Sequence, residues 1–314
     1  MSKILDKEID RPKETLVKLI FQSSFLKNDI IINVRSVLYG DSTFVYRVKT
    51  LKKIYYARFN KNNESFNAEI LIHSILLKHN IKVPLILFYE EKNKETGLSF
   101  MIQEKLSGKS LEENYPSDND LKIILFEAGV QLAKINQIDT INGFGILDSQ
   151  SNEKLNGIEN TFEDYFTNSF EKSLEILDVY PFSSNEKMHI IKLIKKARNI
   201  LFVKRPILAY GDLLLEHIFH KNVEFAGFID FGKVCGNSRL YDLGYITGFY
   251  QNRKLLSYLL LGYKTVASIS DDDLYLIEYF ALCIILKMLG IRANSNRMSY
   301  WYNIMLKQLE AKYE

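Results

Sequence analysis

The sequence predicts an α+β chain with two lobes, a small lobe built on a five-stranded antiparallel sheet and a larger lobe made mostly of helices. In the first part of the chain, short runs rich in Val, Ile, Tyr and Phe alternate with polar turns, which is typical of antiparallel strands. From Leu121 onward, apolar residues instead recur at helical spacing. The chain has 314 residues, which is long for one hydrophobic core and short for three domains, so two lobes are expected.

Five short runs supply the predicted strands of the small lobe. They span residues 33–38, 44–49, 54–59, 85–90 and 98–104. One helix, at residues 64–79, is inserted after the third strand, and Asn80 and Pro84 are expected to end it. A shorter helical pattern at residues 12–22 precedes the sheet. The small lobe is therefore predicted to be a compact α+β unit.

The large lobe begins after a short crossing. We predict a small lobe at residues 1–102, a hinge at 103–108 that ends on Gly108, and a large lobe at 109–314. One face of the first large-lobe helix is lined by Leu121, Leu125, Ala128, Leu132 and Ile135. Further helices are predicted at residues 162–177, 186–202, 240–250, 254–263, 272–289 and 297–312. A β-rich small lobe joined by a single strand to a helical large lobe is a protein-kinase-like architecture.

The composition is that of an ordinary globular protein and argues against several other classes of protein. The net charge is +3, and Lys and Arg are scattered among Asp and Glu, so the sequence does not indicate a basic surface that binds nucleic acid. Two cysteines are too few for a disulfide framework or a zinc site. The longest apolar run, residues 274–289, is interrupted by Glu278 and Lys287, and we expect it to fall short of a membrane span. We therefore expect a cytoplasmic monomer or weak dimer with no nucleic-acid or membrane partner.

One stretch carries a carboxylate at the end of each of two predicted strands. Asp212 follows the run that ends at Ala209, and Asp230 follows the return strand of a hairpin predicted at residues 218–229. Phosphoryl transfer needs one carboxylate to orient the attacking hydroxyl and accept its proton, and metal ligands to hold the nucleotide phosphates. Asp212 is therefore the candidate base, and Asp230, eighteen residues later, is the candidate Mg²⁺ ligand.

The same stretch carries a three-part motif. It consists of Tyr210-Gly211-Asp212-Leu213 with His217-Ile218-Phe219, then Ile229-Asp230-Phe231-Gly232, then Gly236-Asn237 followed by Tyr241-Asp242-Leu243. This motif resembles the aminoglycoside phosphotransferase family, whose wider kin include macrolide, choline and homoserine kinases. The resemblance implies a kinase that uses Asp212 as its catalytic base and Asp230 as a metal ligand, with Mg²⁺ and with ATP or GTP as the phosphate donor.

Two positions depart from the family's pattern. His217 stands where the family usually has a metal-binding Asn, and imidazole is a poorer partner for Mg²⁺ than an amide or carboxylate oxygen. His217 can bind metal through nitrogen, act through water or phosphate, or be purely structural. Tyr210 replaces the first His of the motif, and we expect a scaffold residue that packs and donates one hydrogen bond. Asp242 is expected to brace the loop that carries Asp212.

The resemblance also places nucleotide contacts on a turn and on the hinge. Gly40, Ser42 and Thr43 match the family's strand-turn-strand over the phosphates, where N–H and O–H groups can contact phosphate oxygens. The same residues equally form a plain hairpin turn. At the hinge, the Gln103 carbonyl and the Lys105 N–H are expected to read the edge of the base. Backbone recognition of this kind leaves no sequence code, so ATP versus GTP stays open.

A positively charged residue that anchors the phosphates is expected on the third strand. Tyr56 and Arg58 fall on one face of that strand by two-residue alternation. Relatives have a Lys at the position of Arg58, paired with a helix glutamate that is best matched here by Glu69. Arg keeps the charge, although its reach and shape differ from those of Lys. Tyr56 is a candidate to stack on the base of the nucleotide. The alternative is that Tyr56 and Arg58 lie on a strand face that binds no ligand.

These features predict a small-molecule kinase that transfers the γ-phosphate to a hydroxyl, most simply of an aminoglycoside-type antibiotic. The alternatives are a metabolic kinase of the same fold, acting on choline, homoserine or a sugar, and a nucleotide-binding protein with little transfer activity. Glu278 and the carboxylates of residues 271–273 are candidates to hold a polycation, although Ser270 before three Asp also forms a helix N-terminus. Too few residues separate Asp230 from Tyr241 for the peptide-docking segment of a protein kinase.

Overall fold

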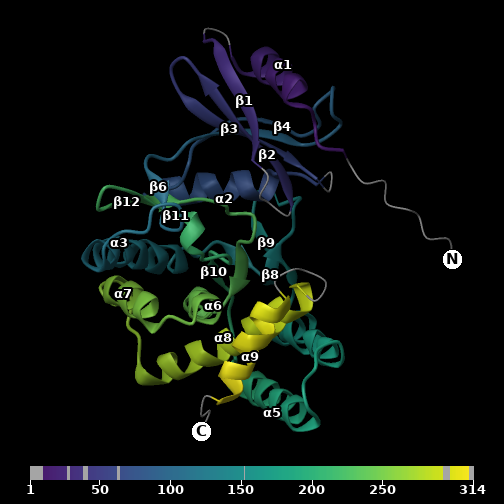
Figure 1. The fold of residues 1–314 in the computed structure, drawn as a ribbon, viewed down its shortest axis with the longest axis vertical. Helices are drawn as coiled ribbons and strands as arrows, with labels where there is room; N and C mark the ends of the chain where they lie inside the picture. Colours follow the sequence, from purple (N-terminus) through teal and green to yellow (C-terminus); the bar gives the residue numbers. More distant parts are fainter. Residues whose placement is uncertain are drawn as a thin grey trace, which may run out of the picture. The chain divides into compact units, whose positions relative to one another are not determined.

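A computed structural model describes residues 10–26, 29–37, 42–61, 64–151, 153–292 and 298–310 (Figure 1). The chain divides into two compact units. The first has the bounds Met1–Ile75, Val83–Leu106 and Ser149–Asn152, and the second has the bounds Leu76–Lys82, Ser107–Asp148 and Glu153–Glu314. The lobe bounds and the hinge at residues 103–108 that we predicted from the sequence stay a prediction.

The first unit is a five-stranded antiparallel sheet with the strand order β1-β2-β3-β5-β4. Its strands are β1 (Ile31–Val37), β2 (Thr43–Thr50), β3 (Ile54–Asn60), β4 (Ile86–Glu90) and β5 (Phe100–Glu104). Helix α1 (Glu14–Ser24) precedes the sheet, and α2 (Asn67–Lys78) follows β3 in the chain. The predicted sheet with one inserted helix is therefore confirmed.

The core of this unit is rich in aromatic rings. Phe59 of β3 and Phe100 of β5 stack with their ring centroids 4.6 Å apart, and Tyr46 of β2 meets Phe59 edge-on at 5.8 Å. Such pairs add about 0.5–1.5 kcal/mol each beyond the burial of their surface. Because these rings come from β2, β3 and β5, they fix the central strand β3, which also carries Arg58.

The second unit is built mainly from helices. They are α3 (Asp118–Asn136), α4 (Phe162–Phe166), α5 (Ser184–Ile200), α6 (Tyr241–Tyr250), α7 (Arg253–Tyr263), α8 (Asp271–Arg292) and α9 (Met298–Glu310). The face of α3 that helical spacing predicted is buried along its whole length, from Leu121 to Ile135. Ser117 caps this helix by accepting a hydrogen bond from the Asp120 N–H.

One segment that we predicted as a regular α-helix is only partly α-helical. The segment predicted at residues 162–177 starts as α4 but continues as a π-helical turn at Thr167–Glu171 and a 3-10 helix at Lys172–Asp178. Phe166 and Phe170 are both buried across the π turn, with ring centroids 5.2 Å apart. A π turn adds a residue to the helical repeat, and the 3.6-residue pattern used to read the sequence does not anticipate it.

The second unit also contains more strands than the sequence predicted. The predicted hairpin is present as β11 (Ile218–Lys221) and β12 (Glu224–Phe228), with Asn222 in the left-handed conformation at the turn, and β6 (Lys109–Ser110) pairs with β11. Another sheet has the order β10-β13-β8-β9-β7. Its strands are β7 (Ile141–Asn142), β8 (Phe144–Leu147), β9 (Leu155–Glu159), β10 (Ile207–Ala209) and β13 (Cys235–Asn237). Strands this short produce no readable alternation.

Helix α8 corrects our expectation about the longest apolar run. An 18-residue stretch within its segment Asp271–Ile291 has a mean hydropathy of 2.0, and the helix is long and apolar enough to cross a membrane by length and composition. The expectation that this run falls short of a span is therefore wrong, because two charged residues do not interrupt so long a helix. However, 61% of that 18-residue stretch is buried inside the protein, with Ile277 and Phe280 in the core. Such burial is typical of the central helix of a globular unit.

Candidate active site

A buried carboxylate holds the backbone of the loop that follows β10. The Tyr210 N–H donates to Oδ2 of Asp242 at 2.8 Å, and the Gly211 N–H donates to Oδ1 at 2.7 Å. Gly211 has φ +87°, and a Cβ there would lie 1.9 Å from the carbonyl oxygen of Lys233, so only glycine fits. Asp242 is fully buried, and burial raises its pKa to about 6, against the two backbone N–H groups that lower it. Asp242 therefore braces this loop.

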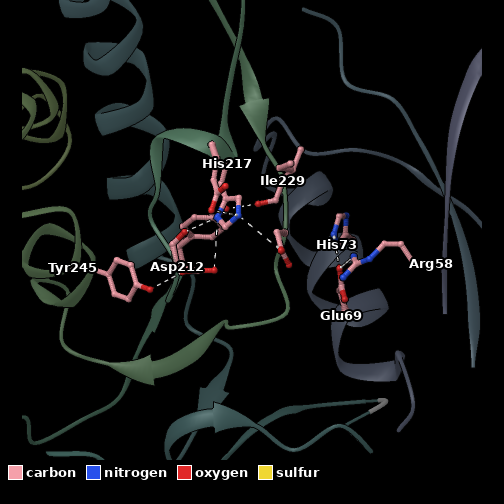
Figure 2. A network of polar contacts seen from close by, with 10 residues as sticks. Arg58, Glu69, His73, Asp212, His217, Ile229 and Tyr245 are labelled. Atoms are coloured by element: carbon pink, nitrogen blue, oxygen red, sulfur yellow. Dashed lines mark hydrogen bonds and ion pairs between the residues drawn. The ribbon is translucent and has the colours of Figure 1, made fainter. Parts of the chain in front are cut away.

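Asp212 presents its carboxylate directly after this anchored backbone. The Tyr245 hydroxyl donates to Oδ1 at 2.7 Å, and Nδ1 of His217 lies 3.7 Å from Oδ2 (Figure 2). Burial raises the pKa of Asp212, while the nearby His217 and the Tyr245 hydrogen bond act in the opposite direction. A carboxylate with a raised pKa and a fixed orientation is suited to accept a proton from a hydroxyl group.

His217 ends a 3-10 turn at Leu215–His217 and faces two further carboxylates. Its Nδ1 lies 2.9 Å from the backbone carbonyl oxygen of Asp212, and since a carbonyl can only accept, this nitrogen carries the proton. In the neutral ring the lone pair is then on Nε2, which lies 3.8 Å from Oε1 of Glu216 and 3.9 Å from Oδ2 of Asp230. An imidazole in this tautomer can offer Nε2 to a cation.

Asp230 follows β12 in an unusual backbone conformation. Its φ is +60°, in the left-handed region that Asp tolerates better than most residues with a side chain. The residue before it is pinned twice. The Ile229 N–H donates to the His217 carbonyl oxygen at 3.1 Å, and the Tyr210 hydroxyl donates to the Ile229 carbonyl oxygen. These contacts aim the Asp230 carboxylate, whose side chain is 46% exposed, toward the His217 ring.

The side chains of Asp212, His217 and Asp230 form a cluster with metal-binding chemistry. One ligand atom from each lies within 4.8 Å of the others, and the described residues contain no second group of this kind. Carboxylate oxygens suit Mg²⁺ and Mn²⁺, and imidazole nitrogen suits divalent transition metals such as Zn²⁺ and Fe²⁺. The donor set therefore fits a divalent cation, and the roles of His217 and Asp230 as its ligands remain a prediction.

In the first unit, the predicted partner of Arg58 is present. Arg58 Nη1 forms an ion pair with Oε1 of Glu69, and both side chains are buried (Figure 2). His73, one helical turn on, places Nε2 at 3.9 Å from the same carboxylate oxygen, and its Nδ1 lies 3.0 Å from the Pro84 carbonyl oxygen. The guanidinium also lies over the Phe66 ring, 5.5 Å from its centroid. The pairing is observed, whereas phosphate binding by Arg58 stays a prediction.

The predicted phosphate-covering turn is described only in part. Gly40 lies outside the described residues. Ser42 is exposed and accepts a hydrogen bond from the Lys61 N–H at its carbonyl oxygen, 3.0 Å away, and Thr43 is buried at the start of β2. Their contacts with a nucleotide therefore stay predictions.

The predicted base-reading residues lie on β3 and near the end of β5. Tyr56 is paired across the sheet with Gln103, and Lys105 follows the last residue of β5. The Lys105 ammonium donates to the Leu106 carbonyl oxygen at 3.1 Å. Tyr56 and Gln103 are half-buried, in contrast to the buried Ala57 between Tyr56 and Arg58. Stacking by Tyr56 and backbone recognition by Gln103 and Lys105 remain predictions.

The contacts of two tyrosines on α6 were not foreseen from the sequence. Tyr245 donates to Asp212, and the Tyr250 hydroxyl accepts from the Leu215 N–H at 2.8 Å. The one local signal concerned Tyr245, which lies three residues after Asp242 on α6, because residues three apart on a helix share a face.

Comparison with known proteins decides the family. The family model described as "Phosphotransferase enzyme family" matches residues 36–264, which is more than half of the chain. The chain belongs to the phosphotransferase enzyme family. This confirms the resemblance to aminoglycoside phosphotransferases and the predicted enzyme class, a phosphotransferase with an alcohol group as acceptor. No match is found among curated protein sequences.

Solved structures of phosphotransferases share the fold. Aminoglycoside phosphotransferase APH(4)-Ia with ADP and hygromycin B is 13% identical, with a TM-score of 0.71 over 93% of this chain and 97% of that one. Aminoglycoside 2'-phosphotransferase-IIIa with GDP is 15% identical, with a TM-score of 0.69 over 95% and 99%. A putative fructosamine-3-kinase from Thermobifida fusca is 15% identical, with a TM-score of 0.64 over 94% and 99%. The predicted kinase-like α+β fold is thereby confirmed.

The buried carboxylate of Asp242 should make the stability of this phosphotransferase depend on pH. The pKa of Asp242 in the folded protein, about 6, lies above its ordinary value of 3.8. The contribution of Asp242 to the free energy of unfolding is therefore complete below about pH 4 and is lost as the pH rises through 6. Relative to Asp242→Asn, the free energy of unfolding of the wild type should fall by about 1–3 kcal/mol across that window. Urea unfolding at several pH values measures this difference, and parallel curves for the two proteins would contradict it.

Proposed function

We propose that this chain transfers the γ-phosphate of a nucleoside triphosphate to a hydroxyl of a small molecule, most simply an aminoglycoside-type antibiotic. The observation that carries the proposal is the convergence of Asp212, His217 and Asp230, whose ligand atoms lie within 4.8 Å of one another at the end of an anchored loop. Phosphoryl transfer depends mainly on positioning and charge stabilisation, and such a cluster can supply both.

Each residue of the cluster has a proposed role. Asp212 accepts a hydrogen bond from the acceptor hydroxyl and takes its proton as the acceptor oxygen bonds to the γ-phosphorus. The bond from that phosphorus to the nucleoside diphosphate breaks, and the diphosphate leaves. Asp230 supplies carboxylate oxygen and His217 supplies Nε2 to a divalent cation, proposed to be Mg²⁺. When bound, the cation neutralises charge on the nucleotide phosphates.

The proposed nucleotide-binding residues lie in the first unit. Arg58, oriented by its ion pair with Glu69, is proposed to contact phosphate oxygens. Gly40, Ser42 and Thr43 are proposed to cover the phosphates through N–H and O–H groups. In known structures of relatives, APH(4)-Ia holds ADP or AMP-PNP and the 2'-phosphotransferase holds GDP, so either ATP or GTP fits the proposal as donor.

Two of the four acidic residues considered for a polycationic substrate, Asp273 and Glu278, are engaged in other contacts. Asp273 caps α8 by accepting from the Ser270 N–H at 2.8 Å, and it pairs with Arg239 at 2.7 Å. Glu278 pairs with Arg253 at 3.2 Å. These contacts favour the reading of residues 271–273 as a helix N-terminus, in which carboxylates complement the helix dipole. Asp273 and Glu278 therefore do not support the aminoglycoside assignment.

A metabolic kinase acting on a sugar derivative is the second candidate. The likeness to a putative fructosamine-3-kinase, at a TM-score of 0.64, favours it, and so does the engagement of Asp273 and Glu278 in other contacts. Support for the aminoglycoside assignment comes from relatives whose structures contain hygromycin B or kanamycin. A nucleotide-binding protein with little transfer activity is the third reading, because His217, Tyr210 and Arg58 all depart from the motif of relatives.

A coupled assay of nucleoside diphosphate release separates these readings. Kanamycin, hygromycin B, a macrolide, choline, homoserine and a fructosamine are each tested as acceptor with ATP and with GTP in the presence of Mg²⁺. Release that depends on an antibiotic supports the first reading, and release that depends on a sugar derivative or another metabolite supports the second. Tight nucleotide binding with no acceptor-dependent release would overturn the proposed function.

Replacing the proposed base tests its role separately from nucleotide binding. Asp212→Asn keeps the size of the side chain but cannot accept the proton, so kcat should fall by about 10²–10⁴-fold. Nucleotide affinity, measured by calorimetry, should change by less than about threefold, because the base contacts the acceptor and not the nucleotide. Asp178→Asn, at a side chain that is 87% exposed, is the matched control and should keep full activity. Retained turnover in Asp212→Asn would contradict the assignment.

Replacing the proposed metal ligand should instead act on the binding of the metal–nucleotide complex. Asp230→Asn removes the carboxylate charge, so the gain in nucleotide affinity that Mg²⁺ provides should shrink by at least about tenfold. Nucleotide affinity measured in EDTA should stay the same. Equal gains from Mg²⁺ in the variant and the wild type would refute the role of Asp230 as a ligand.

A further inference from the structure

The side chain of Asp212 is held by a tyrosine from a distant part of the chain. The Tyr245 hydroxyl donates to Oδ1 of Asp212 at 2.7 Å, and Figure 2 shows the phenol pointing at the carboxylate. The other carboxylate oxygen, Oδ2, lies 3.7 Å from Nδ1 of His217, which is too long for a hydrogen bond. In the part of the chain that the structure describes, the phenol therefore supplies the short hydrogen bond on this carboxylate.

The same helix holds the loop at two other points. Asp242, three residues before Tyr245 on α6, accepts the backbone N–H groups of Tyr210 and Gly211. Tyr250, at the end of α6, accepts the Leu215 N–H at 2.8 Å. One helix thus contacts the backbone before Asp212, the carboxylate of Asp212 itself, and the turn that leads to His217. The side chains of α6 together hold the loop in one conformation.

Helix α6 is held in place by close packing against α8. A Cβ at Gly244 would lie 2.4 Å from Cβ of Phe280 on α8, and a Cβ at Gly248 would lie 2.9 Å from the Ala281 carbonyl oxygen. Both glycines therefore allow α6 to lie directly against α8. The Tyr245 ring is buried and stacks on Phe249 at 6.2 Å, which fixes the direction of its hydroxyl.

A carboxylate without such a partner rotates easily about its last side-chain bond, because that torsion has a broad energy profile. Rotation would turn Oδ2 away from the position where it meets an acceptor hydroxyl. We propose that Tyr245 is a positioning residue, which holds Oδ1 of Asp212 so that Oδ2 faces the acceptor. The inference rests on the proposed function of Asp212 as the base, and it adds a residue that acts through Asp212.

Tyr245→Phe tests this inference, since it removes the hydroxyl and keeps the ring. A positioning role predicts that kcat falls by about 10–100-fold, while the nucleotide KM changes by less than about twofold and the melting temperature is nearly unchanged. In the Asp212→Asn background, the same change should cause no further loss, because Tyr245 acts through that carboxylate.

Tyr258→Phe is the matched control. It removes a similar hydrogen bond from a tyrosine hydroxyl to an aspartate, at 2.9 Å to Asp118, but on α7. Its kcat should stay within about twofold of the wild type. The inference is overturned if Tyr245→Phe keeps wild-type kcat, or if it loses melting temperature and nucleotide affinity together with kcat, which is the result of a purely structural role.

The failure of the proposed function has a different outcome. In that case the wild type releases no diphosphate with any acceptor, and the crystal structure of Tyr245→Phe then decides the positioning claim. The inference predicts that the Asp212 carboxylate is rotated or split between orientations in the variant. A carboxylate that superposes on that of the wild type, with Oδ1 unmoved, would overturn the inference.

Discussion

The two hydrogen bonds from the Tyr210 and Gly211 N–H groups to the Asp242 carboxylate are the constraint on which the site depends. They join a helix to a loop that lies about thirty residues earlier in the chain. A fully buried carboxylate is costly unless its oxygens are hydrogen-bonded, and here each oxygen accepts one backbone N–H. Since Gly211 leaves no room for a Cβ beside the Lys233 carbonyl oxygen, the loop has little freedom to move away.

The positions of the remaining groups follow from this anchor. Asp212 comes directly after the anchored residues, and the Asp212 carbonyl oxygen in turn sets the tautomer of His217 through Nδ1. The His217 carbonyl oxygen accepts the Ile229 N–H, which places Asp230 at the end of the hairpin. A chain of backbone and side-chain hydrogen bonds therefore brings together three residues that come from a loop, a short helical turn and a strand end. Such preorganisation is what catalysis by positioning and charge requires.

Features that depend on neighbouring residues could be predicted from the sequence better than contacts between residues far apart in the chain. Asp212, Asp230 and the hairpin with Asn222 at its turn could be read from the sequence, because turn chemistry and strand alternation are properties of neighbouring residues. The contact of Tyr245 with Asp212 could not, because nothing in the spacing of two residues 33 positions apart shows that they meet. Most of the sheet of β7 to β10 and β13 escaped for a related reason. Only the strand that ends at Ala209 was predicted, because the others are too short for alternation and are stabilised by pairing with distant segments.

Hydrogen exchange at the Tyr210 and Gly211 amides, followed by NMR in the wild type and in Asp242→Ala, is the most direct test of whether Asp242 anchors the loop. Both amides should exchange slowly in the wild type and at least about tenfold faster in the variant, with the amides of β10 still protected. Exchange that is fast in the wild type, or equally slow in both proteins, would show that Asp242 is not the anchor of the loop.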